Sequence, residues 1–365
     1  MTENPAFLRE QIITYIGNKR ALLPFIGEAA AHVQAEVGGR KLSVCDPFSG
    51  SGIVARALRP LAARMTVSDL EGYCETLNRC YLSCAAQREG LDLAARYNAL
   101  TAALEGPLRA GVIARHYAPR HEDAIQAGER VFYTPRNARY LDTARALIAD
   151  MPPEAQPFFL APLLYEASVK ANTAGVFKGF YKNPATGIGQ FGGGGRNALS
   201  RICADMALPF PVFSSFDCPT TVLRMDAHAL AGQLDETDLI YLDPPYNQHP
   251  YGSNYFMLNL LNMGAEPGQR SKVSGIPKGW NRSRYNRRAE ALDALLELCR
   301  ALPARYVMIS MNDEGFIGRE ALEPALRQLG RLEVRQQRYN AFRGSRNLRE
   351  RAIHTTEYLY VLKKN

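Results

Sequence analysis

The feature that most constrains this chain is the tetrapeptide Asp243-Pro244-Pro245-Tyr246, which directly follows the apolar run 238–242. Two consecutive prolines fix φ and remove two N–H donors, so the carbonyl groups here have no ladder to join. In an open α/β sheet, ligands bind at the C-terminal edge of the strands. The pattern therefore predicts a strand that ends in a site for a planar amine. Asp243 and the Pro244 carbonyl would accept its hydrogens while Tyr246 stacks on its ring; a loop after a buried strand would need only one proline and no acid.

A glycine-rich turn lies upstream, between a predicted strand at 42–46 and a predicted helix at 52–62. Glycines let a ligand approach the backbone and the positive N-terminus of the following helix. The next predicted strand, 64–69, ends at Asp69, which is placed to bind two ribose hydroxyls. The turn itself reads Asp46-Pro47-Phe48-Ser49-Gly50-Ser51-Gly52.

The same turn also satisfies the G-x-G-x-x-A fingerprint of dinucleotide-binding enzymes, and Asp69 lies near the expected spacing from it. On the loop alone, a nicotinamide enzyme is a contender. Such an enzyme gives no reason for Asp-Pro-Pro-Tyr or for a basic C-terminal third, so we set it aside.

Together with Tyr15-Ile16-Gly17-Asn18-Lys19, these blocks resemble the Dam-like family of adenine-specific DNA methyltransferases, which use S-adenosylmethionine. The resemblance covers residues 12–84 and 220–363. Asp-Pro-Pro-Tyr with Phe-Ser-Gly-Ser-Gly is a specific combination, whereas the N-terminal motif alone is weak. The resemblance implies that the catalytic residues are Asp243, Pro244, Pro245 and Tyr246. It implies that the cofactor-binding residues are Tyr15, Lys19, Asp46, Phe48, Gly50, Gly52, Asp69, Asp226 and Asp243. Asp226 could equally be the N-cap of the segment that follows it.

In this family, the order of the blocks marks a subgroup whose DNA-recognition region lies between the two halves of the catalytic sheet. We therefore expect a catalytic domain formed by residues 1–88 and 220–365 and an inserted, largely helical target-recognition domain at 89–219. The insertion is too long for a loop without structure of its own.

Strands alternate with helical segments, which favours a doubly wound α/β fold with a mostly parallel, seven-stranded sheet. The last two strands lack a long helix between them and are expected to form an antiparallel closing pair. The predicted strands are 42–46, 64–69, 220–225, 238–243, 305–311, 332–339 and 357–363, and the predicted helices of the catalytic part are 52–62, 71–88, 288–301 and 319–329.

The net charge of +8 is concentrated in a few segments. Residues 270–288 contain seven basic and no acidic side chains, and residues 170–201 contain five basic and no acidic ones. Basic segments with interleaved aromatic and amide side chains favour contact with nucleic acid, although solvated loops are an alternative. The residues expected to contact double-stranded DNA are Lys178, Lys182, Arg196, Lys278, Arg282, Arg284, Arg287, Arg343 and Arg346.

The remaining composition restricts the setting. Seven cysteines include no C-x-x-C pair, and His228 and His249 lack paired ligand spacing, so we expect no metal. With no secretory signal and no transmembrane helix, a cytoplasmic protein is expected. We expect a monomer or weak dimer that methylates N6 of adenine by base flipping, either with a cognate restriction endonuclease or as an orphan enzyme. Cytosine amines, structured RNA and a DNA-binding protein with a vestigial fold remain alternatives.

Overall fold

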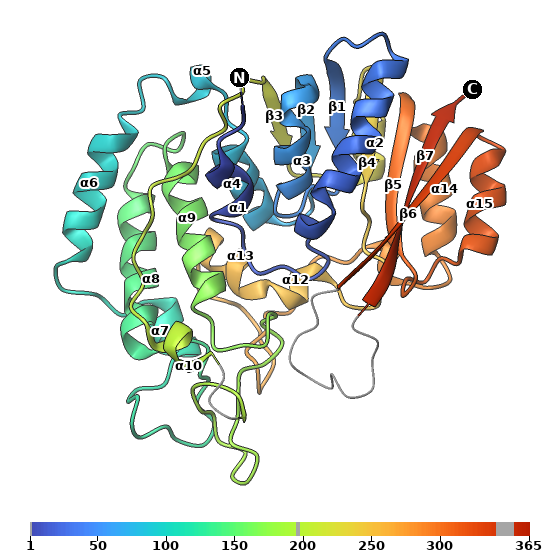
Figure 1. Cartoon of the computed structure of the whole chain (residues 1–365). Helices are drawn as coiled ribbons and strands as arrows, with labels where there is room; N and C mark the ends of the chain where they lie inside the picture. Colours follow the sequence, from blue (N-terminus) through green and yellow to red (C-terminus); the bar gives the residue numbers. More distant parts are fainter. Residues whose placement is uncertain (1, 195–197, 341–353) are drawn as a thin grey trace.

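A computed structural model describes residues 2–194, 198–340 and 354–365 of the chain (Figure 1). Three residues expected to contact DNA, Arg196, Arg343 and Arg346, lie outside the described residues.

The described residues form one seven-stranded sheet with the strand order β3-β2-β1-β4-β5-β7-β6. Strands β1 to β5 pair in parallel, and β7 runs antiparallel to both β5 and β6. The predicted doubly wound, mostly parallel sheet with an antiparallel closing pair is therefore confirmed. The strands are β1 Leu42–Asp46, β2 Ala62–Ser68, β3 Thr220–Leu223, β4 Thr237–Leu242, β5 Ala304–Asn312, β6 Gly330–Asn340 and β7 His354–Lys364.

Strand β4 lies between β1 and β5, and every one of its residues is buried. A parallel strand covered on both faces has no need of polar alternation, which is why residues 238–242 read as a nearly continuous apolar run. Leu239 and Tyr241 point into one hydrophobic cluster, whereas Ile240 and Leu242 point into the other. The strand ends at Leu242, so Asp243 is the first residue beyond the sheet edge.

Helices cover both faces of the sheet (Figure 1). The predicted helix at 71–88 is broken at 82–84, and the one predicted at 52–62 ends at Leu58 and continues as a 3₁₀ turn. One cluster contains α1 Pro5–Arg9, α2 Leu23–Glu36, α3 Ile53–Leu58, α4 Gly72–Tyr81 and α13 Phe256–Met263. The other contains α11 Ala227–Ala231, α14 Ala291–Ala301 and α15 Arg319–Arg327. The short helices α5 Ala85–Arg88 and α12 Tyr251–Asn254 complete this part of the chain.

Residues 89–219 form a helical region beside the sheet, at the left of Figure 1. Its side chains belong to the same hydrophobic cluster as α4 and α13. Pro162 lies inside α9, so this buried helix, apolar on nearly all sides, was not predicted from the sequence. The helices are α6 Leu93–Leu104, α7 Val112–Tyr117, α8 Pro135–Ala149, α9 Gln156–Val169 and α10 Leu199–Cys203. Among the described residues, no helix combines the length and apolarity required to cross a membrane.

Candidate active site

The N-terminal motif is fixed against the chain that follows Asp-Pro-Pro-Tyr. The ring of Tyr15 stacks against those of Tyr251 and Tyr255, with centroid distances of 4.9 and 4.8 Å. The Ile16 N–H donates to Tyr255 Oη at 2.7 Å, and Tyr251 Oη donates to the Ile16 carbonyl at 3.0 Å. These contacts carry Lys19, which is more than 200 residues away in sequence, to the end of β4.

The glycine turn between β1 and α3 requires backbone that only glycine adopts easily. Gly50 has φ 49° and Gly52 has φ 77°. A Cβ on Gly52 would lie 2.2 Å from Asn78 Oδ1, so the buried Asn78 side chain would have to move to admit one. The Gly50 N–H donates to Asp69 Oδ2 at 2.9 Å, and the Glu71 N–H donates to Asp69 Oδ1 at 2.9 Å. Asp69 therefore joins the turn to the end of β2.

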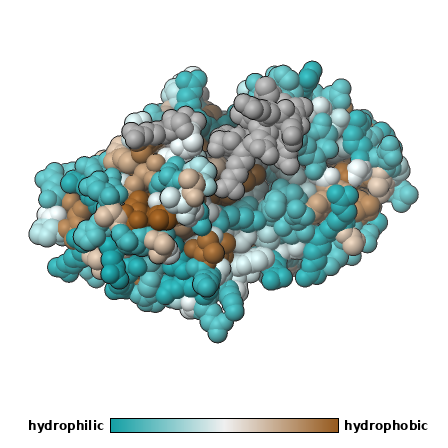
Figure 2. All heavy atoms as spheres, turned by 90° about the horizontal axis from the view of Figure 1, so that it is seen from below, coloured by the Kyte–Doolittle hydropathy of each residue, from teal (hydrophilic) through white to brown (hydrophobic). Residues whose placement is uncertain are grey.

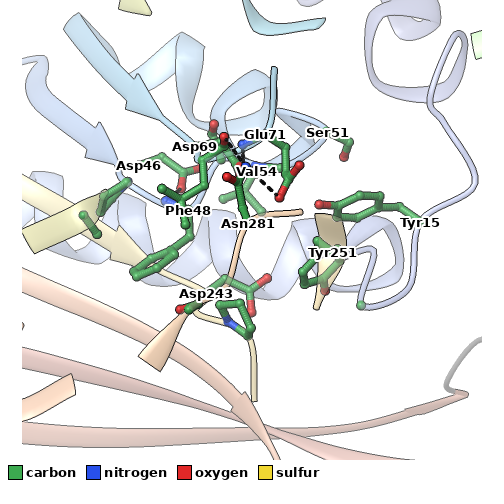
Figure 3. A pocket seen from close by; sticks show the side chains of 18 of the residues that line it. Tyr15, Asp46, Phe48, Ser51, Val54, Asp69, Glu71, Asp243, Tyr251 and Asn281 are labelled. Carbon is green, nitrogen blue, oxygen red and sulfur yellow. Dashed lines mark hydrogen bonds between the residues drawn. The ribbon is translucent and has the colours of Figure 1, made fainter. Parts of the chain in front are cut away.

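A pocket of about 890 Å³, including its open mouth, lies at this edge of the sheet (Figure 3). Gly50 and Asp243 line the same pocket, so the sheet brings the two sequence motifs together. The predicted residues in its wall are Tyr15, Lys19, Asp46, Phe48, Gly50, Asp69, Asp226, Asp243, Pro245 and Arg282. Gly52, Pro244 and Tyr246 are not part of that wall.

The wall of the pocket is rich in carboxyl groups. Asp46, Asp69, Glu71 and Asp243 come from the ends of neighbouring strands and converge on one cavity (Figure 3). Burial raises the pKa of Asp46 well above its usual range, and Asp243 and Asp69 raise it further by repulsion. Burial also raises the pKa of Asp69 and of Glu71. Clustered acids that are costly to ionise together favour a ligand that carries positive charge.

Asp243 lies next to a buried cation, the ammonium group of Lys19. Burial raises its pKa from 3.8 to about 6, while Lys19 opposes this shift and Glu357 adds to it. Lys19 Nζ lies 3.2 Å from Asp243 Oδ1 and 2.7 Å from Glu357 Oε1, and the lysine side chain is only 2 % exposed. Although burial lowers the pKa of Lys19, these two carboxylates hold it well above its usual value. The lysine is therefore charged, and its ammonium lies 5.7 Å from the centre of the Tyr246 ring.

Asp226 serves as an N-cap. Its side chain accepts from the His228 N–H at 2.9 Å at the start of α11, and it also lines the pocket. The capping alternative is therefore confirmed, and a contact with the cofactor is compatible with it.

Part of the pocket wall was not predicted from the sequence. Asn281 Nδ2 donates to the Leu70 carbonyl at 2.9 Å and to Glu71 Oε1 at 3.3 Å. Asn286 Nδ2 donates to the Asn247 carbonyl at 2.8 Å. The basic segment 270–288 is thereby tied to the pocket. Asn286 is one of the amides interleaved in that segment and was interpreted only as a nucleic-acid contact, whereas Asn281 was not singled out.

The described residues predicted to contact DNA fall into two groups: two arginines that form ion pairs with acids, and four basic side chains for which no such pair is found. Arg284 pairs with Glu297 at 2.6 Å, and Arg287 pairs with Glu290 at 2.8 Å. In the other group, Arg282 stacks over the Trp280 ring at 4.6 Å.

Three lysines are in the same group as Arg282, and all four side chains are exposed. Lys178 Nζ lies 3.1 Å from His249 Nδ1, three residues beyond Asp-Pro-Pro-Tyr. Lys182 and Lys278 are exposed on two short hairpins, which contain the bridges Lys182↔Gly189 and Arg270↔Pro277. The face seen from below is largely hydrophilic (Figure 2).

Comparisons with known proteins show the family. The chain is 28% identical over 361 residues to the type II methyltransferase M.NlaIII of Neisseria lactamica, which covers 96% of this chain and 99% of that protein. It is 26% identical to the type II methyltransferase M.CviAII of Paramecium bursaria Chlorella virus 1, over 91% of this chain and 93% of that protein. It is 23% identical to the modification methylase StsI of Streptococcus sanguinis, over 96% of this chain and 52% of that protein. The model of the D12 class of N6 adenine-specific DNA methyltransferases matches residues 15–191 and 213–296. The chain therefore belongs to the D12 class of N6 adenine-specific DNA methyltransferases.

Proposed function

We propose that this enzyme methylates N6 of adenine within one short sequence of double-stranded DNA, with the residues of the described pocket in the roles given below. The observation that carries the proposal is the pocket that Asp243 shares with the glycine turn. Family membership establishes the reaction class, and methyl transfer by this class depends on S-adenosylmethionine.

The pocket residues fit that cofactor. S-adenosylmethionine carries a sulfonium and an ammonium group, and the pocket presents carboxyl groups from Asp46, Asp69, Glu71, Asp226 and Asp243. The left-handed Gly50 and Gly52 leave the backbone open for close approach. We assign the cofactor to the wall formed by Tyr15, Asp46, Phe48, Gly50, Asp69 and Asp226. When bound there, it would supply an electrophilic methyl group.

Asp243 acts on the target amine. The exocyclic nitrogen of adenine is a poor nucleophile because its lone pair is delocalised into the ring. A carboxylate that accepts one of its hydrogens, with the Pro244 carbonyl accepting the other, favours a tetrahedral nitrogen and stabilises the developing positive charge. Since the pKa of Asp243 is about 6, it is an ionised acceptor at neutral pH. Tyr246 would stack on the adenine ring.

We propose that the target adenine is flipped out of the duplex. Asp243 is only 19 % exposed, so an adenine stacked inside a duplex cannot reach it. The exposed basic side chains Lys178, Lys182, Lys278 and Arg282 support a contact with the DNA backbone beside the pocket. We further propose that residues 89–219 carry target recognition, although they share a hydrophobic cluster with the catalytic part.

The names of the relatives bear on whether this enzyme is part of a restriction–modification system. Two of them are named as type II methyltransferases. We propose that this protein modifies cytoplasmic DNA as a monomer or weak dimer, either with a cognate restriction endonuclease or as an orphan enzyme.

Genome sequencing tests this function. The enzyme and its Asp243→Ala variant are each expressed in a bacterium without DNA methylation, and modified bases are then mapped. We expect N6-methyladenine in one short sequence context with the wild type and none with the variant. Methylated cytosine, or an unmodified genome despite folded protein that binds S-adenosylmethionine, would contradict the proposal.

A further inference from the structure

A buried carboxylate outside the pocket, Glu357, holds the lysine that contacts Asp243. Glu357 lies on β7, opposite Asn312 of β5, and is 1 % exposed. Its Oε1 accepts from Lys19 at 2.7 Å, which is shorter than the 3.2 Å from the same ammonium to Asp243 Oδ1. The lysine therefore lies between two acids and closer to the one that is remote from the pocket.

Glu357 is itself held in place from two strands. Ser310 Oγ on β5 donates to its Oε1 at 2.6 Å, and Tyr339 Oη on β6 donates to its Oε2 at 3.2 Å. Three donors on one buried carboxylate fix its position within the sheet. A lysine stem has several rotatable bonds, so this fixed partner determines where the ammonium lies.

The position of the Lys19 ammonium affects Asp243, the carboxylate proposed to act on the target amine. The closest approach of Lys19 to Asp243 is to Oδ1, and among the described residues no hydrogen bond to Oδ2 is found. An ammonium free to move fully onto Asp243 would compete with the substrate for the oxygens of this carboxylate. Because Glu357 holds the ammonium from the other side, Oδ2 remains an acceptor for the amine.

We infer that Glu357 is a positioning residue for methyl transfer: it fixes the Lys19 ammonium beside Oδ1 of Asp243 and so keeps Oδ2 available to the target amine. The inference rests on the proposed role of Asp243. It adds a requirement from strand β7, none of whose described residues lines the pocket.

Glu357 also affects the proton affinity of Asp243. The titratable groups around this carboxylate are Lys19, Glu357, Asp46, Tyr241, Tyr246 and Tyr251. Burial is the main cause of its raised pKa, Lys19 lowers the pKa, and Glu357 raises it. Removing the charge of Glu357 while Lys19 stays charged therefore lowers the pKa of Asp243. The acid limb of the rate profile then moves to lower pH.

The test compares the full-length wild type with Glu357→Gln in single-turnover methyl transfer to DNA across pH 5 to 9. We expect kcat at the plateau to fall by about tenfold or more, with the Kd of S-adenosylmethionine changed by less than about threefold. The midpoint of the acid limb should fall by about half a pH unit or more. Glu36→Gln is the control, since Glu36 contacts Lys363 of β7 at 3.2 Å on the surface. It should leave both rate and midpoint unchanged.

Two further variants separate positioning from folding. Glu357→Asp keeps the negative charge, so the midpoint of its acid limb should equal that of the wild type. Its kcat should fall several-fold, because the shorter side chain moves the Lys19 ammonium. In a Lys19→Met background, Glu357→Gln should lower kcat by no more than about twofold, because it acts through the lysine.

Wild-type kcat and midpoint in Glu357→Gln would overturn the inference. If that variant does not fold, wild-type kcat in Glu357→Asp would overturn it instead. If the wild type methylates an acceptor other than adenine, the proposed substrate is wrong, and the same profiles measured on that acceptor still decide the role of Glu357.

Discussion

Replacing Asp243 by Asn should stabilise the protein at neutral pH while abolishing methyl transfer. A carboxyl group whose pKa is higher in the folded protein than in the unfolded chain stabilises the fold below the unfolded pKa. That stability is lost as the pH rises through the folded pKa. For Asp243 the two values are about 6 and 3.8. At about 1.4 kcal/mol per pKa unit, the ionised aspartate costs folding about 3 kcal/mol.

Asparagine resembles the protonated acid and avoids this cost. The Asp243→Asn variant should therefore exceed the wild type in free energy of unfolding by about 3 kcal/mol at pH 8 and by roughly half that at pH 5. Lys19 keeps Glu357 as its partner in the variant.

Urea unfolding of the protein without cofactor, at both pH values, measures the difference. Asp235→Asn, at a side chain that is 90 % exposed, controls for the loss of one negative charge. A stability difference that is the same at pH 5 and pH 8, or a variant less stable than wild type at pH 8, would refute the reasoning.

Three further predictions concern the turn, the lysine and the DNA surface. Gly52→Ala should lower the Tm and weaken binding of S-adenosylmethionine, because its Cβ would meet Asn78 Oδ1 at 2.2 Å. Gly39→Ala has nearly the same φ of 74° in open space and should cost only about 1–2 kcal/mol, so equal losses in the two variants would contradict a steric role for the turn. Lys19→Met removes the group that lowers the pKa of Asp243, so the acid limb of its residual rate should move above pH 6, and a lower midpoint would reverse the assignment. Arg282→Ala should reduce the slope of log K against log salt for DNA binding by about one, whereas Arg284→Ala, at a side chain paired with Glu297, should leave it unchanged. Equal slopes in all three proteins would exclude Arg282 from the phosphate contacts.

Local patterns were sufficient for the sheet and for the chemistry at its edge. A strand buried on both faces has to be apolar throughout, so residues 238–242 predicted β4 directly. Asp243 and Asp69 each follow a strand that points to the same edge, which is why their convergence could be expected before any coordinates were known. Helix limits were less well predicted, since packing and not propensity decides whether Pro162 lies inside α9.

Long-range contacts were beyond the reach of the sequence. The local sequence around Glu357 does not distinguish it from an exposed acid on a strand. The antiparallel pairing of β7 with β5 nevertheless buries it against Lys19. Arg284 belongs to a basic run, yet the fold pairs it with Glu297 of α14, whereas Arg287 pairs locally with Glu290, three residues further on. The sequence by itself determined the residue types and the sheet edge at which they act, because strand pattern and turn chemistry are local. Only the tertiary structure decided that Lys19 is shared between Asp243 and Glu357, because these partners lie 224 and 338 residues from it in the chain.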